Sequence, residues 1–237
     1  MPIKGQPIPW PRILAEGAAI VVSILLAFAI DAAWQHRGEV AEEREILVGL
    51  EAEYVDLRDR LEFWAQMNRQ GMSLIERYLS GEARSMSRGE LEELFVHSML
   101  ANVLDQGGPL DALLASGRLE RIEDRAIRVR LAKWPDWLED IHTNDLSARD
   151  FAFREIAPFL AERGIPRVLC PEGEWACAPD DTIPRDYVEL SENPQFRALL
   201  LFRRGLMWMA AADHEQATVE ANELLAMISD RLDALGG

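Results

Sequence analysis

An apolar run near the amino terminus dominates the hydrophobic pattern, within the stretch ILAEGAAIVVSILLAFAIDAAWQHR. Its uncharged part, residues 17–30, has 14 residues, a length more typical of a core helix or a signal-peptide core than of a membrane span. The apolar flanks before Glu16 and after Asp31 extend the run to about 22 residues, roughly 33 Å of helix, which matches the hydrocarbon thickness of a bilayer. We therefore predict a transmembrane helix over residues 13–36, after an amino-terminal tail of residues 1–12.

The residues at the two ends of this run fit the polar surfaces of a membrane. Glu16 and Asp31 are expected near the headgroups, because an acid at the midplane costs about 2.5–3.5 kcal/mol. Trp10 and Trp34 stand about 36 Å apart on a helix, the separation of the two aromatic belts of a membrane. Together with Arg12, these residues form the predicted membrane interface.

Two other interpretations of the run stay open. A cleaved signal peptide would use Lys4 and Arg12 as its basic start and the small residues at 27–29 as its cleavage site. The acid inside the apolar region disfavours that interpretation. An amphipathic or buried core helix is the third interpretation.

The charges around the run favour an amino terminus on the cytoplasmic side of a bacterial inner membrane. Lys4 and Arg12 stand without acids in the tail, whereas Arg37 and Arg44 lie among glutamates. Basic residues set topology and acids count little, so the preference is slight. It leaves the main domain, residues 37–237, in the periplasm.

Two cysteines support the periplasmic location. Cys170 and Cys177 occur in CPEGEWAC, within a stretch rich in Pro and acids that predicts an irregular loop over residues 164–193. A disulfide between them would place the domain in an oxidising compartment. Two unrelated thiols are the alternative, and a metal site lacks further Cys or a nearby His.

The rest of the chain has the periodicity of helices. Ser87 and Glu90 form a capping box, and Asn193 followed by Pro194 predicts the start of a long carboxy-terminal helix. A stripe at alternating steps of three and four follows the membrane helix, formed by Leu47, Leu50, Tyr54, Leu57, Leu61 and Trp64. We expect it to pack inside its own domain, with a coiled coil between copies as the alternative. The predicted fold is all-α: one transmembrane helix running into an antiparallel helical bundle.

Charge excludes some partners. The net charge of −16 disfavours nucleic acid, since a binder must neutralise phosphates with clustered Lys and Arg. The same charge disfavours binding flat against an anionic membrane surface.

No motif in the sequence predicts catalysis, a metal or a cofactor. Glu139 and His142 have the spacing of one half of a di-iron site, but such a site needs a second Glu-x-x-His and two further Glu. Nucleophile elbows, phosphate-binding loops and HExxH are missing from the sequence. We therefore predict no enzyme.

Five of the seven tryptophans remain to be assigned. Trp64 and Trp208 fall on helical stripes and are expected in the core. Trp134, Trp137 and Trp175 lie near Pro135 or within the cysteine loop, where large aromatics can anchor a partner surface.

Two segments resemble a family of uncharacterised bacterial single-span membrane proteins: EGAAIVVSILLAFAIDAAWQHRGEVAEEREILVGLEAEY and LLASGRLERIEDRAIRVRLAKW. The resemblance covers about a third of the chain. It implies the anchor and an acidic helical domain, and no known activity. The residues that match its pattern are Asp31, Trp34, Ser116, Gly117, Leu119 and Ile122.

The sequence thus predicts an accessory or scaffold subunit that packs on a larger integral membrane complex, such as a respiratory or photosynthetic one. The alternative is a membrane-tethered sensor or ligand-binding domain that self-associates through the stripe of residues 47–64.

Overall fold

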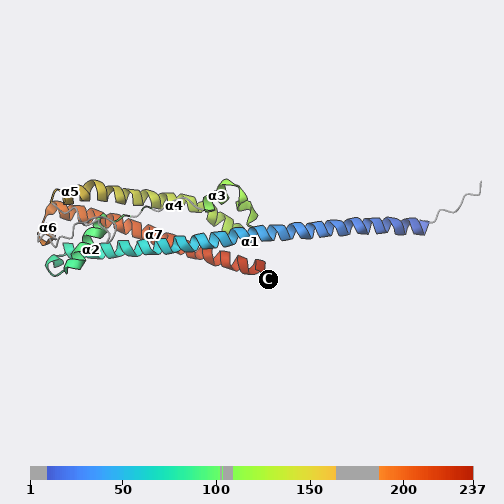
Figure 1. Cartoon of the computed structure of the whole chain (residues 1–237), viewed down its shortest axis with the longest axis horizontal. Coiled ribbons are helices and arrows are strands. Elements are labelled where there is room, and N and C mark those ends of the chain that lie inside the picture. Colours follow the sequence, from blue (N-terminus) through green and yellow to red (C-terminus); the bar gives the residue numbers. More distant parts are fainter. Residues whose placement is uncertain (1–9, 102, 104–108, 164–186, 237) are drawn as a thin grey trace, which may run out of the picture.

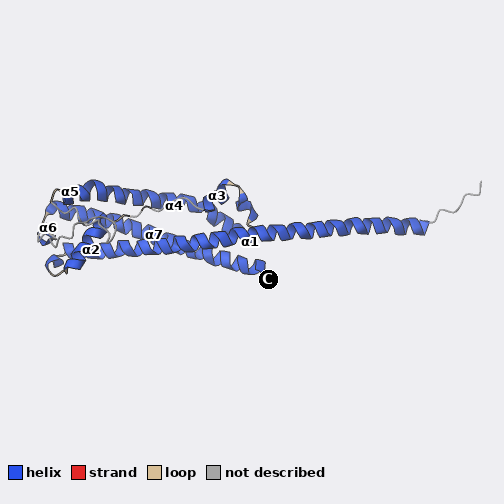
Figure 2. Cartoon of the chain, in the orientation of Figure 1, coloured by secondary structure: helices blue, strands red, loops and turns tan. Residues whose placement is uncertain are grey.

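The chain is all-α in a computed structural model that describes residues 10–101, 103, 109–163 and 187–236 (Figure 1). No strand occurs in these ranges (Figure 2). The elements in chain order are α1 (Trp10–Leu79), η1 (Glu82–Arg84), α2 (Arg88–Met99), α3 (Pro109–Ala115), η2 (Arg118–Arg121), α4 (Arg125–Phe151), η3 (Ala152–Ile156), α5 (Ala157–Ala161), α6 (Tyr187–Leu190) and α7 (Pro194–Gly236).

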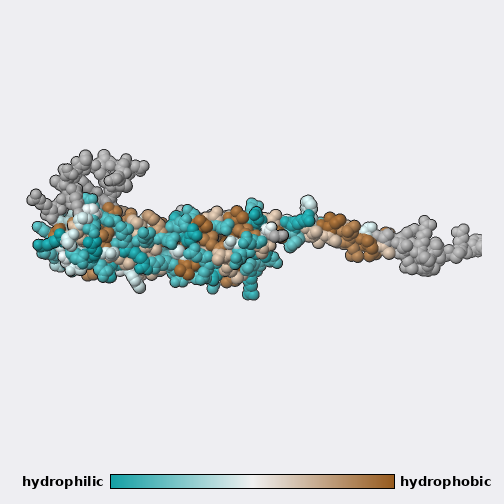
Figure 3. Space-filling model, turned by 90° about the horizontal axis from the view of Figure 1, so that it is seen from below, coloured by the Kyte–Doolittle hydropathy of each residue, from teal (hydrophilic) through white to brown (hydrophobic). Residues whose placement is uncertain are grey.

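Helix α1 is a single unbroken helix of 70 residues. Its amino-terminal part extends beyond the bundle, whereas its carboxy-terminal part packs against α7, which runs back along it (Figure 1). The described stretch Ile20–Leu79 includes an 18-residue window of mean hydropathy 1.3, none of it buried. Such a helix near the amino terminus is typical of a membrane anchor or a signal sequence. Figure 3 shows the apolar surface gathered on this extension, beyond a mostly polar domain.

Two caps predicted from the sequence are confirmed. The Ser87 hydroxyl accepts from the Glu90 amide at 3.3 Å, and the Glu90 carboxylate accepts from the Ser87 amide at 2.8 Å. Bonds from Ser87 and from Arg77 lower the pKa of Glu90 to about 2, with Arg77 as the larger cause. The side chain of Asn193 accepts from the Phe196 amide at 3.0 Å and opens α7.

The bundle holds two apolar cores, one at each end. The distal core, far from the free end of α1, joins the end of α1 to α2, η3, α5 and the start of α7, around Tyr78, Phe95 and Phe196. The proximal core joins α1 residues 46–61 to α3, α4 and the second half of α7. The predicted stripe packs here within its own chain: Leu47, Leu50, Tyr54, Leu57 and Leu61 are all buried. A self-associating dimer through this stripe is therefore not favoured.

The structure sets several boundaries that the sequence left open. Helix α2 ends at Met99, where Leu100 adopts an extended conformation. Helix α4 continues through Pro135 for 27 residues and is followed directly by the π-helical η3. The end of the predicted loop over residues 164–193 forms the short helix α6, and most of that loop lies outside the described residues.

Gly38 lies in the exposed part of α1 between the apolar run and the bundle. A Cβ added there meets nothing within 4 Å, so Gly38 only weakens the helix. We expect Gly38→Ala to stabilise this segment by about 1 kcal/mol and to slow amide hydrogen exchange around it about fivefold. Gly49→Ala, at an equally open position, should leave exchange near residue 38 unchanged. Equal effects of both variants would contradict the prediction.

Candidate interaction surface

A stripe of exposed apolar side chains runs along one face of α7. Its large members are Leu201, Phe202, Trp208 and Met209, and Trp208 is 64% exposed. Gly205 lies between them and Ala212 beyond them on the same face, and Val219 follows after the exposed Gln216. From Leu201 to Val219 the stripe is about 27 Å long. We call this surface the α7 stripe.

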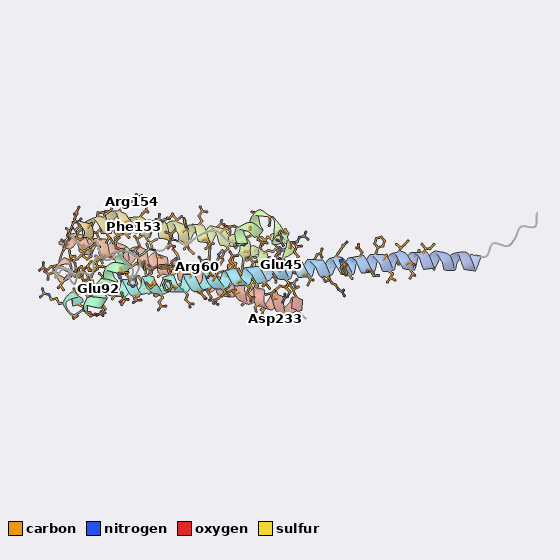
Figure 4. The ribbon with its side chains drawn as sticks, viewed as in Figure 1. Glu45, Arg60, Glu92, Phe153, Arg154 and Asp233 are labelled. Atoms are coloured by element: carbon orange, nitrogen blue, oxygen red, sulfur yellow. The ribbon has the colours of Figure 1, made fainter. Side chains whose placement is uncertain are left out.

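Phe151 and η3 extend the stripe sideways. The ring of Phe202 lies 4.6 Å from that of Phe151, and Phe153 in η3 is exposed (Figure 4). Contiguous apolar surface of this kind is typical of an interface with another macromolecule.

Polar contacts flank the stripe on both sides. Toward α1, Arg204 lies 3.6 Å from Glu76, and Glu215 accepts two hydrogen bonds from Arg69. Those bonds lower the pKa of Glu215. Toward α4, Asn144 donates to Asp213 at 2.8 Å, and Arg130 contacts Glu220 at 2.8 Å. The polar groups on each side are thus paired with groups on α1 or α4. The α7 stripe lies between these two rows of pairs.

Polar side chains are also buried in the bundle: Arg203 and His214 on α7, Asp145 on α4, and His97 and Ser98 on α2. We call this set the polar layer. Arg203 is 1% exposed and donates to the carbonyls of Ala148, at 3.3 Å, and Leu100. Burial lowers its pKa to about 10, partly opposed by the charge of Asp145. Arg203 therefore remains charged at neutral pH.

The Asp145 and His214 side chains complete the layer. Asp145 Oδ1 lies 3.4 Å from His214 Nε2, and both residues are almost fully buried. Burial also lowers the pKa of His97, against the attraction of Glu93 at 4.0 Å. Within the described part of the chain, no group of three His, Cys, Asp or Glu could hold a metal ion.

A second charged cluster closes the proximal end of the bundle. Glu43 on α1 is 3% exposed and accepts two hydrogen bonds from Arg231 of α7, at 3.0 and 2.8 Å. It also accepts from the backbone amide of Glu123 at 2.9 Å. Burial raises the pKa of Glu43, but the bonds from Arg231 and Glu123 outweigh it and leave the pKa below its ordinary value. We call this cluster the Glu43 clamp.

The predicted membrane-interface residues all lie on α1 outside the bundle. Trp34 is exposed, and Asp31 accepts from Gln35 at 3.1 Å. Trp10, Arg12 and Glu16 belong to the helix, but their side chains lie outside the described residues.

The structure describes two of the three predicted partner contacts, Trp134 and Trp137, whose rings lie 6.0 Å apart. Trp134 is only 4% exposed and packs on Tyr54 in the proximal core, so it is not available on an outer surface. Trp137 is half-buried beside Trp134. Cys170, Cys177 and Trp175 lie outside the described residues.

The stripe itself was missed from the sequence, because Trp208 was placed in the core. Helix α7 is apolar on two faces, and Leu200 and Met207, not Trp208, are buried. The sequence signal for a second apolar face was the spacing i, i+1, i+7 and i+8 of Leu201, Phe202, Trp208 and Met209, next to the face that packs in the core.

Comparisons with known proteins found no match among protein-family models, curated proteins or solved structures.

Proposed function

We propose that the chain is a single-span accessory subunit, anchored by the first part of α1, whose helical domain docks on a larger integral membrane assembly through the α7 stripe. The amino terminus lies in the cytoplasm and the domain in the periplasm. The protein acts by binding and carries out no reaction of its own. The observation that carries this proposal is the long uncharged stripe between two rows of polar contacts.

The exposed apolar part of α1 supports the anchor. The apolar side chains from Ile20 to Ile30 contact nothing in their own bundle and are at least half exposed. Burying them in lipid is favourable, at about 25 cal/mol per Å² of apolar surface.

The occupant of the stripe is a protein, because lipid cannot reach it. Glu215, beside the stripe, pairs with Arg69, which lies 35 residues beyond Trp34 on the same helix. At 1.5 Å per residue, Arg69 therefore lies about 53 Å along the helix from Trp34, which marks the predicted membrane interface. A partner surface that covers the stripe must therefore project from the membrane, and it must be apolar.

The test is purification of the full-length protein in mild detergent, with a photo-crosslinking residue at position 208. We expect a stoichiometric membrane partner that crosslinks at this position. The double variant Phe202→Ser/Trp208→Ser should lose the partner and keep its helix content and melting temperature, since both side chains are exposed.

Phe63→Ser is the matched control, because Phe63 is also a large exposed side chain but lies on α1. It should retain the partner. A protein that runs alone in mild detergent would count against the proposal, as would equal partner loss in both variants.

A further inference from the structure

A groove opens between α4 and α7 on the side of the proximal core. Its volume is about 670 Å³, within the range of small-molecule sites. Its walls come from Arg125, Val129, Lys133 and Trp137 on one row of α4, from Ala126, Arg130 and Trp134 on the next row, and from Glu220 and Leu224 of α7. Three cationic side chains thus face one carboxylate in a protein whose net charge is −16.

Among the described residues, Arg125 and Lys133 differ from most cations of the domain in having no paired carboxylate. The third cation, Arg130, is neutralised by Glu220 at 2.8 Å and Glu223 at 2.6 Å. Arg125 and Lys133 have no ion-pair partner in the described part of the chain. Most arginines between positions 58 and 231 do contact a carboxylate, as expected where acids outnumber bases by 41 to 25. The groove therefore keeps positive charge available for an anion.

Aromatic surface lies directly beside this charge. Lys133 and Trp137 are four residues apart, so they are neighbours on α4, about 6 Å apart along its axis. The rings of Trp134 and Trp137 are 6.0 Å apart and tilted by 39°. Trp134 packs edge-on against Tyr54 in the proximal core, with the ring centroids 5.0 Å apart. A flat apolar body stacks well on such rings.

We infer that the α4–α7 groove binds a small aromatic carboxylate, with its anionic group at Lys133 and its ring against Trp137. Arg125, two turns away on the same row, adds to the positive field. The site needs neither the anchor nor the α7 stripe, so its test stands apart from that of the proposed function.

The amine of Lys133 can be labelled to report binding at this site. Lys4 and Lys133 are its only lysines, so reductive methylation with ¹³C-formaldehyde labels these two amines and the amino terminus. Dimethylation keeps the positive charge. We would titrate the labelled full-length protein in lipid nanodiscs with 2-naphthoate and follow the methyl signals by NMR.

We expect 2-naphthoate to shift the Lys133 signal saturably and to leave the Lys4 and amino-terminal signals unmoved. The neutral analogue 2-naphthamide should bind about tenfold more weakly, because it lacks the charge. Acetate, which lacks the ring, should not saturate the signal.

Variants of the groove complete the test. By tryptophan fluorescence, Lys133→Gln should weaken binding of 2-naphthoate about tenfold, and Arg125→Gln should weaken it less. Arg154→Gln removes the same charge at the far end of the bundle (Figure 4), where Arg154 pairs with Asp150, and it should bind as the parent does.

Three results would overturn the inference: no saturable Lys133 shift, equal affinity for the amide, or unchanged affinity in Lys133→Gln. A tryptophan-capped polyglutamate peptide that shifts Lys133 at lower concentrations than 2-naphthoate would also overturn it, in favour of an acidic protein segment.

Discussion

Replacing Arg203 by methionine is expected to lower the free energy of unfolding by about 3–5 kcal/mol, the range for a buried charge network that loses one partner. The variant removes a side chain that is 1% exposed. It leaves the Leu100 carbonyl without its Arg203 donor and takes the Arg203 bond from the Ala148 carbonyl, which keeps its bond from the Ala152 amide. It also removes the charge of Arg203 from the neighbourhood of Asp145. Each of these losses carries a desolvation cost.

Arg204→Met is the matched control, because it changes the same residue type one position away. Arg204 is exposed and lies 3.6 Å from Glu76, so its loss should change the free energy of unfolding by under about 0.5 kcal/mol. Urea unfolding followed by circular dichroism in mild detergent measures both variants. Equal midpoints would show that the buried layer does not stabilise the fold.

Glu43→Gln should destabilise the domain by about 2 kcal/mol, the value of charge-assisted hydrogen bonds in a buried setting. The variant keeps the shape of the side chain but weakens the bonds from Arg231 and from the Glu123 amide. The carboxy-terminal turns of α7 should lose protection from hydrogen exchange first, because the Glu43 clamp ties that end to α1.

Glu43 also makes the free energy of unfolding depend on pH. The pKa of Glu43 lies below its ordinary value of 4.5 in the folded protein, so the unfolded chain takes up the proton first as the pH falls. The stabilisation is therefore complete above about pH 4.5 and is lost as the pH falls through the lowered pKa. Glu43→Gln should remove this part of the acid dependence.

Unfolding curves from pH 3 to 7 test the acid dependence. Glu42→Gln is the control, since Glu42 pairs with Arg118 and Arg121 at 3.3 and 3.6 Å on the surface. It should keep the slope of the parent protein. A slope that Glu43→Gln leaves unchanged would assign the acid dependence to other carboxyl groups.

Local rules predicted much of the fold. Ser87, Glu90 and Asn193 define helix starts through neighbours in the sequence, so their roles could be predicted without tertiary information. The stripe from Leu47 to Leu61 has one apolar face on a charged helix, and only that face can be buried.

The α7 stripe could not be predicted from the sequence. On α7, Trp208 and Met207 are adjacent apolar residues that point in different directions, and periodicity alone does not tell which faces the core. Arg203 breaks the rule that charges stay outside, because the carbonyl groups that hold it come from residues about 55 and 103 positions away. The unpaired state of Lys133 likewise depends on where distant carboxylates lie.

Because α1 is unbroken, it acts as a lever arm. Leu79 lies 45 residues beyond Trp34, about 68 Å along the helix. With the first part of α1 in a bilayer, a tilt of about 20°, average for such helices, moves the far end sideways by roughly 23 Å relative to an upright helix. In the proposed anchored state, a bilayer thinner than the apolar segment favours a larger tilt, so lipid composition would change which surfaces the distal end can reach.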